Sequence, residues 1–218
     1  MPLPPWMTRA LTVAQDWLYP PRCAVCDATA PPLCAACAAA IAPAPPMPWD
    51  LPYLAAARAA GAYAPPLSIA IQNFKYGGRL ELARPLGILL YSVLAPVMED
   101  WKVDAIVPVP LHWRRQLRRG FNQAEVLARE VARMTGSPLD LGVLRRIRHV
   151  PPQVGLTRAE RLANLRGAFA LGPRATVVGR RLLLVDDVCT TGATLVAAAE
   201  PLAQAGAAAI FGLVVACA

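Results

Sequence analysis

Two continuous apolar stretches constrain the fold of this chain more than any other feature. Residues 181–185 read Arg-Leu-Leu-Leu-Val and residues 210–215 read Ile-Phe-Gly-Leu-Val-Val, without the alternation of a half-exposed strand. Strands of this kind are buried on both faces, which is typical of parallel sheets. A helical stretch separates the two, as the crossover between parallel strands requires. The sequence therefore predicts an α/β fold with a parallel sheet flanked by helices.

A proline-rich segment divides the chain into two parts. Residues 42–52 hold five prolines, which lack a backbone donor and favour extended geometry, so we interpret this segment as a linker. The 218 residues have room for one full domain and a small appendage. We expect residues 1–52 to form an N-terminal helix, a cysteine module and the linker. The α/β domain is expected to cover residues 53–218.

In the second part, the apolar pattern predicts helices and strands in alternation. The predicted helices cover residues 65–74, 79–98, 120–135 and 192–205. The predicted strands cover residues 103–107, 143–147, 181–186 and 209–216, and a long basic loop covers residues 148–168. In parallel sheets, ligands bind at the carboxyl ends of the strands, so the residues that follow each strand are the candidates for function.

The net charge points to an anionic partner. Residues 1–60 carry three basic and three acidic side chains, whereas residues 61–218 carry 19 and 11, so the second part holds the whole excess of +8. Nearly all of these cations are arginines, which bind phosphate groups in a bidentate manner. A phosphorylated ligand or nucleic acid is therefore the partner to test, and ordinary solubilising surface charge is the alternative.

The sequence gives little support for a membrane or secreted protein. The longest strongly apolar run covers residues 85–97, well short of the roughly 20 residues that a membrane helix needs. The first 20 residues carry a single cation, Arg9, and no small-residue cleavage site, so they do not resemble a secretory signal. We therefore expect no membrane-spanning segment and a cytoplasmic location.

Four cysteines form a metal-binding pattern in the N-terminal part. They occur as C-x2-C-x7-C-x2-C, and two such pairs offer the four thiolates that structural zinc prefers. Reduced core cysteines and disulfides are the alternatives, of which disulfides are rare in cytosolic proteins. We interpret Cys189 and Cys217 as small apolar core residues. The predicted zinc ligands are Cys23, Cys26, Cys34 and Cys37.

A candidate anion-binding loop follows the strand predicted at 181–186. Two carboxylates, Asp186 and Asp187, precede a run of hydroxyl groups and a glycine, and a helix follows. The glycine lets a ligand approach the backbone, and the N–H groups at a helix start attract anions. A ribose 5-phosphate group needs both hydroxyl acceptors and a phosphate cradle, so it fits this loop; an Asp pair that caps a turn is the alternative. The expected phosphate-binding residues are Thr190, Thr191, Gly192, Ala193 and Thr194.

At these residues the sequence resembles the type I phosphoribosyltransferases. Their motif for phosphoribosyl pyrophosphate (PRPP) is an apolar strand followed by Asp-Asp-x-x-Thr-Thr-Gly-x-Thr, which residues 182–194 match without a gap. Residues 74–77, 108–112 and 119–123, together with the cysteine array, more narrowly resemble the ComF family. The resemblance implies a phosphoribosyltransferase fold at 53–218, an N-terminal zinc-finger-like module, and Mg²⁺ bound together with PRPP.

The resemblance also implies how the rest of the pocket is built. The turn after the strand at 103–107, taken as the first strand of the sheet, corresponds to the pyrophosphate loop, with Val109, Pro110 and Leu111 as binding residues. His112 is either a general acid or only a polar side chain, and the sequence does not decide between these roles. The next arginines either neutralise a diphosphate or lie on the solvated start of a helix; they are Arg114, Arg115, Arg118 and Arg119.

The basic loop after the second predicted strand resembles the lid of the PRPP amidotransferases, which closes over the diphosphate. Long loops inside compact domains are often lids or binding loops. The alternative is a surface helix at 158–165 whose arginines face solvent. The residues of the lid pattern are Gln153, Thr157, Arg158, Arg161, Asn164 and Arg166.

We therefore expect a Mg²⁺-dependent phosphoribosyltransferase in which an acceptor displaces pyrophosphate from C1 of the ribose. The predicted catalytic residues are Asp186, Asp187 and Arg161, and no segment identifies the acceptor. ComF proteins are associated with DNA uptake and competence, so single-stranded DNA and DNA-uptake proteins are further candidate partners. One alternative is a PRPP-binding protein without turnover. Another is a zinc-ribbon protein that handles single-stranded DNA in natural transformation, which the scarcity of aromatics among the arginines disfavours.

Overall fold

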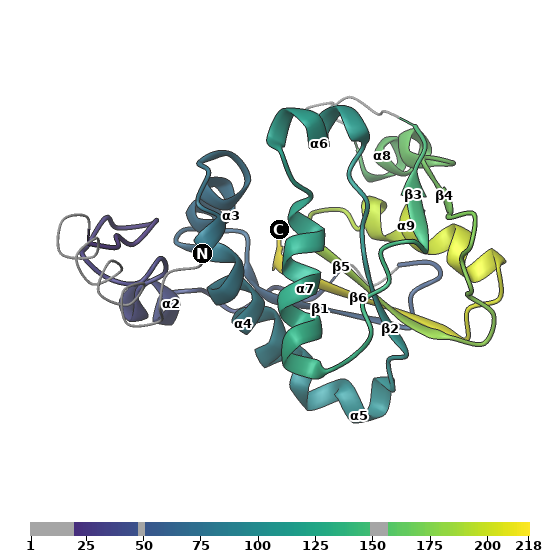
Figure 1. Cartoon of the computed structure of the whole chain (residues 1–218), viewed down its shortest axis with the longest axis horizontal. Helices are drawn as coiled ribbons and strands as arrows, with labels where there is room; N and C mark the ends of the chain where they lie inside the picture. Colours follow the sequence, from purple (N-terminus) through teal and green to yellow (C-terminus); the bar gives the residue numbers. More distant parts are fainter. Residues whose placement is uncertain (1–19, 48–50, 149–156) are drawn as a thin grey trace, which may run out of the picture.

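The computed structural model describes residues 20–47, 51–148 and 157–218 (Figure 1). The N-terminal helix expected in the first part of the chain lies outside these residues, and so does the first part of the expected lid. The division of the chain into two domains near residue 52 remains a prediction.

A four-stranded parallel sheet lies at the centre of the structure, which confirms the predicted fold class. Its strands follow the order β1-β6-β5-β2, and every neighbouring pair is parallel. The register of the central pair sets Leu184 of one strand beside Gly212 of the other. The strands are β1 (Ala56–Ala62), β2 (Ala105–Pro108), β5 (Arg181–Cys189) and β6 (Ala209–Cys217).

Alternate residues of β5 pack into two hydrophobic cores, one on each face of the sheet. Leu183 and Val185 belong to the core on the face covered by α3, α4 and α7. Leu182 and Leu184 belong to the opposite core, which includes residues of α9. Figure 1 shows the first three helices on one side of the strands and α9 on the other. These helices are α3 (Leu67–Tyr76), α4 (Ala83–Leu94), α7 (Gln123–Thr135) and α9 (Ala193–Gln204).

Several elements differ from the prediction. β1 was not expected, and its presence makes β2 the second strand of the sheet in chain order instead of the first. The strand expected at 143–147 is β3 (Leu144–Arg146), which pairs antiparallel with β4 (Phe169–Leu171) outside the parallel sheet. The region expected as a basic loop contains α8 (Arg158–Leu165), where the alternative surface helix was considered. Another helix, α6 (Trp113–Arg119), follows β2.

A continuous helical stretch covers residues 80–101. It joins η1 (Leu80–Leu82), α4, η2 (Ala95–Val97) and α5 (Met98–Trp101). Its 22 residues are long and apolar enough to cross a membrane by length and composition alone, and the expectation that the chain has no membrane-spanning segment stays a prediction. The apolar pattern also has a structural reason, because one face of the stretch is buried in the core. This face consists of Leu82, Leu86, Leu90 and Leu94.

The cysteine module, residues 22–39, packs against α3. Its short helix is α2 (Ala35–Ala39), and the module lies beside α3 at the purple end of the chain in Figure 1. Ala24 and Leu33 join the same hydrophobic core as Ile71 and Phe74 of α3. The module therefore shares one hydrophobic core with α3 and with the face of the sheet that α3 covers.

Candidate functional site

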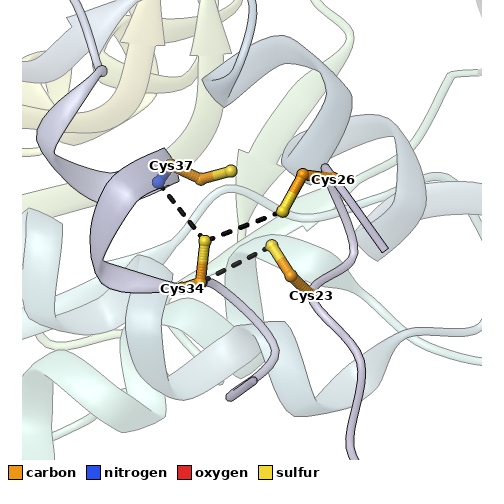
Figure 2. Close-up of side chains that lie close together, drawn as sticks. All are labelled: Cys23, Cys26, Cys34 and Cys37. Carbon is orange, nitrogen blue, oxygen red and sulfur yellow. Dashed lines mark hydrogen bonds between the residues drawn. The ribbon is translucent and has the colours of Figure 1, made fainter. Parts of the chain in front are cut away.

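The four cysteines of the N-terminal pattern converge on one point (Figure 2). Their Sγ atoms all lie within 4.8 Å of one another, and those of Cys26 and Cys34 are 3.8 Å apart. Four sulfurs around a tetrahedral zinc, with Zn–S bonds of about 2.3 Å, lie about 3.8 Å apart. The cluster Cys23, Cys26, Cys34 and Cys37 is therefore compatible with structural zinc.

Backbone donors surround this cluster. The N–H of Cys37 donates to Sγ of Cys34, which caps α2, and the N–H of Cys34 donates to Sγ of Cys23 at 3.5 Å. Burial alone would raise the pKa of Cys23, but N–H groups of neighbouring residues lower it to about 6. Burial and hydrogen bonds with the other thiols raise the pKa of Cys37 to about 12. The environment thus favours a thiolate at Cys23, the form that binds a metal.

The two remaining cysteines lie apart from this cluster. Cys189 and Cys217 are buried at paired positions near the ends of β5 and β6. Burial raises the pKa of both thiols, that of Cys189 to about 12. They are therefore protonated core residues at neutral pH, in line with the interpretation as small apolar side chains.

The carboxylate pair lies within β5. The strand continues to Cys189, so Asp186 and Asp187 precede its carboxyl end instead of following it. Both side chains are buried, and Oδ1 of Asp186 accepts a hydrogen bond of 2.9 Å from the N–H of Asp187. Burial and the charge of Asp187 raise the pKa of Asp186 to about 7. Two buried acids in this arrangement need a cation or hydroxyl donors to carry two negative charges.

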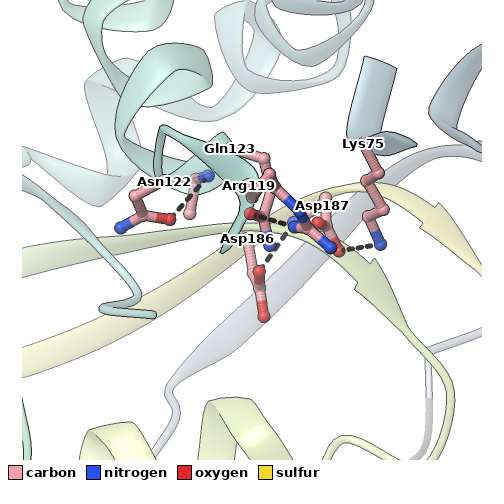
Figure 3. Close-up of polar contacts among 7 residues, drawn as sticks. Lys75, Arg119, Asn122, Gln123, Asp186 and Asp187 are labelled. Carbon is pink, nitrogen blue, oxygen red and sulfur yellow. Dashed lines mark hydrogen bonds and ion pairs between the residues drawn. The ribbon is translucent and has the colours of Figure 1, made fainter. Parts of the chain in front are cut away.

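A lysine from outside the motif supplies one cation. Nζ of Lys75, at the end of α3, lies 2.7 Å from Oδ1 of Asp187 (Figure 3). The second oxygen of this carboxylate, Oδ2, is buried and accepts no hydrogen bond from any part of the chain that the structure describes. An acceptor of this kind is rare in proteins unless a ligand, an ion or water satisfies it.

The loop between β5 and α9 and the first turn of α9 contain the residues that the sequence predicts to bind a phosphate. Gly192 caps α9 with a φ of 77°, a left-handed conformation that glycine adopts without strain. Oγ1 of Thr191 accepts a weak hydrogen bond of 3.4 Å from the N–H of Ala193. Thr194 lies in the first turn of α9. The loop therefore sets hydroxyl groups and a helix N-terminus next to the carboxylate pair.

The expected lid segment meets this loop. Nη1 of Arg161, on α8, donates a hydrogen bond of 3.2 Å to Oγ1 of Thr190. A capping box between Thr157 and Glu160 begins the helix and explains why this basic stretch is helical. The structure thus brings together two residues that the sequence predicts for the same ligand. Gln153 and the side chain of Arg158 lie outside the described residues.

The turn after β2 completes the edge of the site. The N–H of Val109 donates to the carbonyl of Val185, and Nδ2 of Asn122 donates to the carbonyl of Val109 at 3.2 Å. Asn122 also caps α7 through the N–H of Ala124. These bonds fix the turn that contains Pro110 and Leu111 against the start of α7.

The four arginines after this turn all lie on α6. Arg119 donates to the buried side chain of Gln123, and its guanidinium lies 4.7 Å from the ring centre of Tyr76. His112 is buried against Trp113, which leaves its role open. The backbone of α6 includes the other predicted arginines, whose side chains lie outside the described part; they are Arg114, Arg115 and Arg118.

Three residues near the carboxylates were not predicted as site residues. Asn122 and Gln123 lie in the segment 119–123 and Lys75 lies in the segment 74–77, both of which resemble the ComF family. The sequence alone assigns none of them to the site, whereas Figure 3 shows them beside the carboxylates. A signal for Lys75 exists in the composition, because only Lys75 and Lys102 are lysines among the 22 cations. Lysine presents a compact point charge, which suits a single carboxylate oxygen better than the planar arginine does.

Comparison with known proteins identifies the class that this fold and site define. Residues 94–218, more than half of the chain, match the family described as phosphoribosyl transferase domain. The chain therefore belongs to this family.

Individual relatives narrow the assignment. The chain is 40% identical over 139 residues to competence protein F of Haemophilus influenzae, covering 62% of this chain and 61% of that protein. It is 38% identical over 151 residues to the DNA utilization protein YhgH of Escherichia coli, covering 68% and 66%. It is 34% identical over 140 residues to competence protein ComFC of Bacillus subtilis, covering 64% and 54%. These matches confirm the expected resemblance to the ComF family.

The matched part spans between 54% and 66% of the length of these relatives. Among solved structures, the chain is similar to the crystal structure of TT1426 from Thermus thermophilus, with 22% sequence identity and a TM-score of 0.36. That similarity covers 61% of this chain and 83% of the other.

Proposed function

We propose that this protein binds PRPP together with Mg²⁺ and transfers its phosphoribosyl group to an acceptor, with release of pyrophosphate. The observation that carries the proposal is the meeting of three groups at one edge of the sheet. These are the buried carboxylate pair, the Thr-Thr-Gly loop at a helix start, and Arg161 bonded to Thr190. A ligand that has both ribose hydroxyls and phosphates uses all three.

Each part of the site has a role in this reaction. Asp186 and Asp187 accept hydrogen bonds from the ribose hydroxyls and orient the sugar. The loop at Thr190–Thr194 binds the 5-phosphate, and the turn at Val109–Leu111 binds the diphosphate. Arg161 donates to phosphate oxygens and helps to exclude water from C1 as the pyrophosphate leaves and charge develops on it.

The residues present fit a magnesium ion. The donor set is made of carboxylate oxygens, which Mg²⁺ prefers, and Oδ2 of Asp187 is a buried acceptor without a partner among the described residues. When bound, the ion would neutralise charge on the diphosphate. Asp186 and Asp187 would hold it, either directly or through water.

Calorimetric titration of PRPP and Mg²⁺ tests this proposal. Wild type should bind, and the double variant Asp186→Asn/Asp187→Asn should not. A binding-competent wild type is then incubated with candidate acceptors, and pyrophosphate release is followed. Binding without release for any nucleobase or amine would support the alternative of a PRPP-binding protein without turnover. No binding by folded, zinc-loaded wild type would contradict both.

A role in DNA handling is the second candidate, and two observations favour it. The relatives are named competence and DNA utilization proteins. Two aromatic side chains near the arginines, Tyr76 and Trp113, are largely exposed, at 75% and 57%, and aromatic rings of this kind stack on bases. Binding of single-stranded DNA should then fall steeply with salt and be weakened by Trp113→Ala. Binding unaffected by that change would contradict a stacking role.

We further propose that Cys23, Cys26, Cys34 and Cys37 bind one structural zinc ion. The support is the convergence of four sulfurs in a segment that contributes only a few residues to the core. Because all four positions of a tetrahedron are then filled by protein, this ion would have no open position for chemistry.

A further inference from the structure

We propose that Lys75 is a positioning residue of the ribose site and that the cysteine module holds it in place through Asn73. This inference rests on the proposed function, since it concerns how the carboxylate pair meets the ribose. It gives the cysteine module a specific part in ligand recognition.

The first step is the geometry of the ion pair. Lys75 and Asp187 are nearly buried, with 16% and 7% of their side chains exposed, and only Oδ1 of the carboxylate faces the ammonium. The contact therefore fixes the rotation of the carboxylate and leaves Oδ2 as the oxygen without a partner among the described residues. An ammonium is a point charge that engages one oxygen, so the other stays available to a ligand hydroxyl.

The second step is the way in which α3 ends. The carbonyl of Asn73 accepts hydrogen bonds from the N–H groups of Gly77 and Arg79, so the chain after Lys75 folds back over Asn73. A Cβ atom at Gly77 would lie 2.9 Å from that carbonyl oxygen, so the fold-back has no room for a side chain. Lys75 therefore lies in a helix end whose position depends on Asn73.

The third step links this helix end to the cysteines. Nδ2 of Asn73 donates a hydrogen bond of 2.6 Å to the carbonyl of Ala24, and Nη2 of Arg79 donates to the carbonyl of Arg22. These two carbonyls belong to the residues on either side of Cys23. Both bonds therefore connect the backbone around Cys23, the first proposed metal ligand, to the end of the helix that contains Lys75.

Packing supports the same link. Ala24 is buried in one hydrophobic core together with Ile71, one turn before Lys75, and Phe74, the residue directly before it. On the far side of the helix end, the ring of Tyr76 lies under the guanidinium of Arg119 at 4.7 Å. The end of α3 is thus held between the cysteine module and the end of α6, and a shift of Cys23 would move Lys75 relative to β5.

The test compares two ligands that differ in one hydroxyl. Ribose 5-phosphate and 2-deoxyribose 5-phosphate are titrated into the zinc-loaded full chain by calorimetry. Wild type should prefer the ribose by about tenfold, as a hydrogen bond to an ionised group provides. Lys75→Met should remove most of this preference and leave the affinity for the deoxy sugar within about twofold, and Lys75→Arg should restore part of it. Equal weakening of both sugars would mean that Lys75 contacts the phosphate, and would overturn a positioning role.

Asn73→Ala tests the link to the module, with Gln72→Ala on the exposed side of the same helix as its control. We expect the Asn73 variant to keep its zinc and its circular dichroism spectrum but to lose the preference as Lys75→Met does. The Gln72 variant should retain it. A zinc-loaded Asn73 variant with the full tenfold preference would disprove the link.

The outcomes for the inference and for the proposed function are separate. Wild type that binds neither PRPP nor either sugar phosphate contradicts the proposed function, and the inference with it. Wild type that binds with the preference, while both Lys75 variants keep it, contradicts the inference alone.

Discussion

The ammonium of Lys75 lies 2.7 Å from Oδ1 of Asp187, although 112 positions separate the two residues in the chain. Asp187 belongs to the segment that matches the phosphoribosyl transferase family, whereas Lys75 precedes that segment, which begins at residue 94. The ion pair therefore joins a part of the chain outside the family match to the carboxylates inside it. Because α3 also contacts the cysteine module, the three parts form one connected structure around the site.

Loss of a charged group at the site should depress turnover strongly. Asp187→Ala removes the proposed ribose acceptor and leaves the ammonium of Lys75 without its partner, and Arg161→Ala removes the cation at Thr190. We expect each change to lower the rate of pyrophosphate release by about 10²–10³ once an acceptor is known, as preorganised electrostatic groups do. Before that, calorimetry should show a matching loss of PRPP affinity.

Arg129→Ala is the control for these variants. Arg129 is exposed on α7 and, among the described residues, pairs with Glu125 four residues earlier, a contact worth about 0.3–0.5 kcal/mol. The rate and the affinity should stay at the wild-type values. An equal loss in the Arg129 variant would mean that general positive charge, and not the position of Arg161, matters for the ligand.

The stability of the protein should depend on the proton of Asp186. Burial and the charge of Asp187 raise the pKa of Asp186 from 3.8 to about 7, so the folded protein keeps a proton that the unfolded chain releases between these values. The stabilising contribution of this proton grows as the pH falls from about 7 and is lost as the pH rises through it. Between pH 8 and pH 5.5, the free energy of unfolding of wild type should gain about 2 kcal/mol relative to Asp186→Asn. Denaturant unfolding that runs parallel for the two proteins would contradict the shift.

The same proton should oppose ligand binding. A protonated Asp186 is a weaker acceptor for ribose hydroxyls and a poor ligand for Mg²⁺, so PRPP affinity should decline below pH 7 by up to about tenfold per pH unit. In the Asp186→Asn variant, which binds more weakly throughout, this dependence should vanish. Calorimetry at constant ionic strength between pH 5.5 and pH 8 measures both curves.

The sequence predicted the parts of the fold whose signal is local. The apolar run before Asp186 and the hydroxyls after it identify strand, loop and helix from one short segment, and the structure contains all three. β1 was missed because its Ala-Ala-Arg-Ala-Ala-Gly-Ala sequence has low strand propensity. It forms because its backbone pairs with the neighbouring strand β6. Gly61 suits this place because a side chain there would meet Ile41 and Leu67.

The role of Lys75 could not be predicted from the sequence for a different reason. Its partner is distant in the chain, and only the packing of α3 across the sheet brings the two together. The contact between Arg161 and Thr190 also depends on a fold-level approach, of α8 to the loop before α9. Motif spacing identifies which residues are chemically suited to a ligand, whereas long-range packing decides which of them meet.

Zinc should be present at one ion per chain and should stabilise the structure. Cys23→Ser removes a ligand whose thiolate is stabilised by backbone donors, so this variant should lose the metal and melt at a lower temperature. Cys189→Ala, which changes a buried cysteine outside the cluster, is the control and should keep one zinc per chain. Metal analysis of chelator-free protein and thermal unfolding provide the two readouts. Well under one zinc in wild type would exclude the metal site.

Two glycines with the same backbone conformation should separate strain from ligand binding. Gly192 and Gly136 have φ angles of 77° and 73°, so alanine at either position adds a similar strain of about 1–2 kcal/mol. At Gly192 the new Cβ would also lie 2.2 Å from Cδ2 of Leu51, whereas at Gly136 nothing lies within 4 Å. Gly192→Ala must therefore displace the loop that is proposed to hold the 5-phosphate, or displace Leu51.

We expect both glycine variants to lose stability in urea unfolding, Gly192→Ala at least as much as Gly136→Ala because of its clash with Leu51, and only Gly192→Ala to weaken PRPP binding. The loss of affinity should reach about tenfold or more, because a backbone shift at a helix N-terminus misdirects the N–H groups that meet the phosphate. Gly136→Ala lies at the far end of α7, so its affinity should equal that of wild type. If PRPP binds equally well to both variants, the phosphate does not sit on this loop, and its contacts must come from the arginines of α6 and α8.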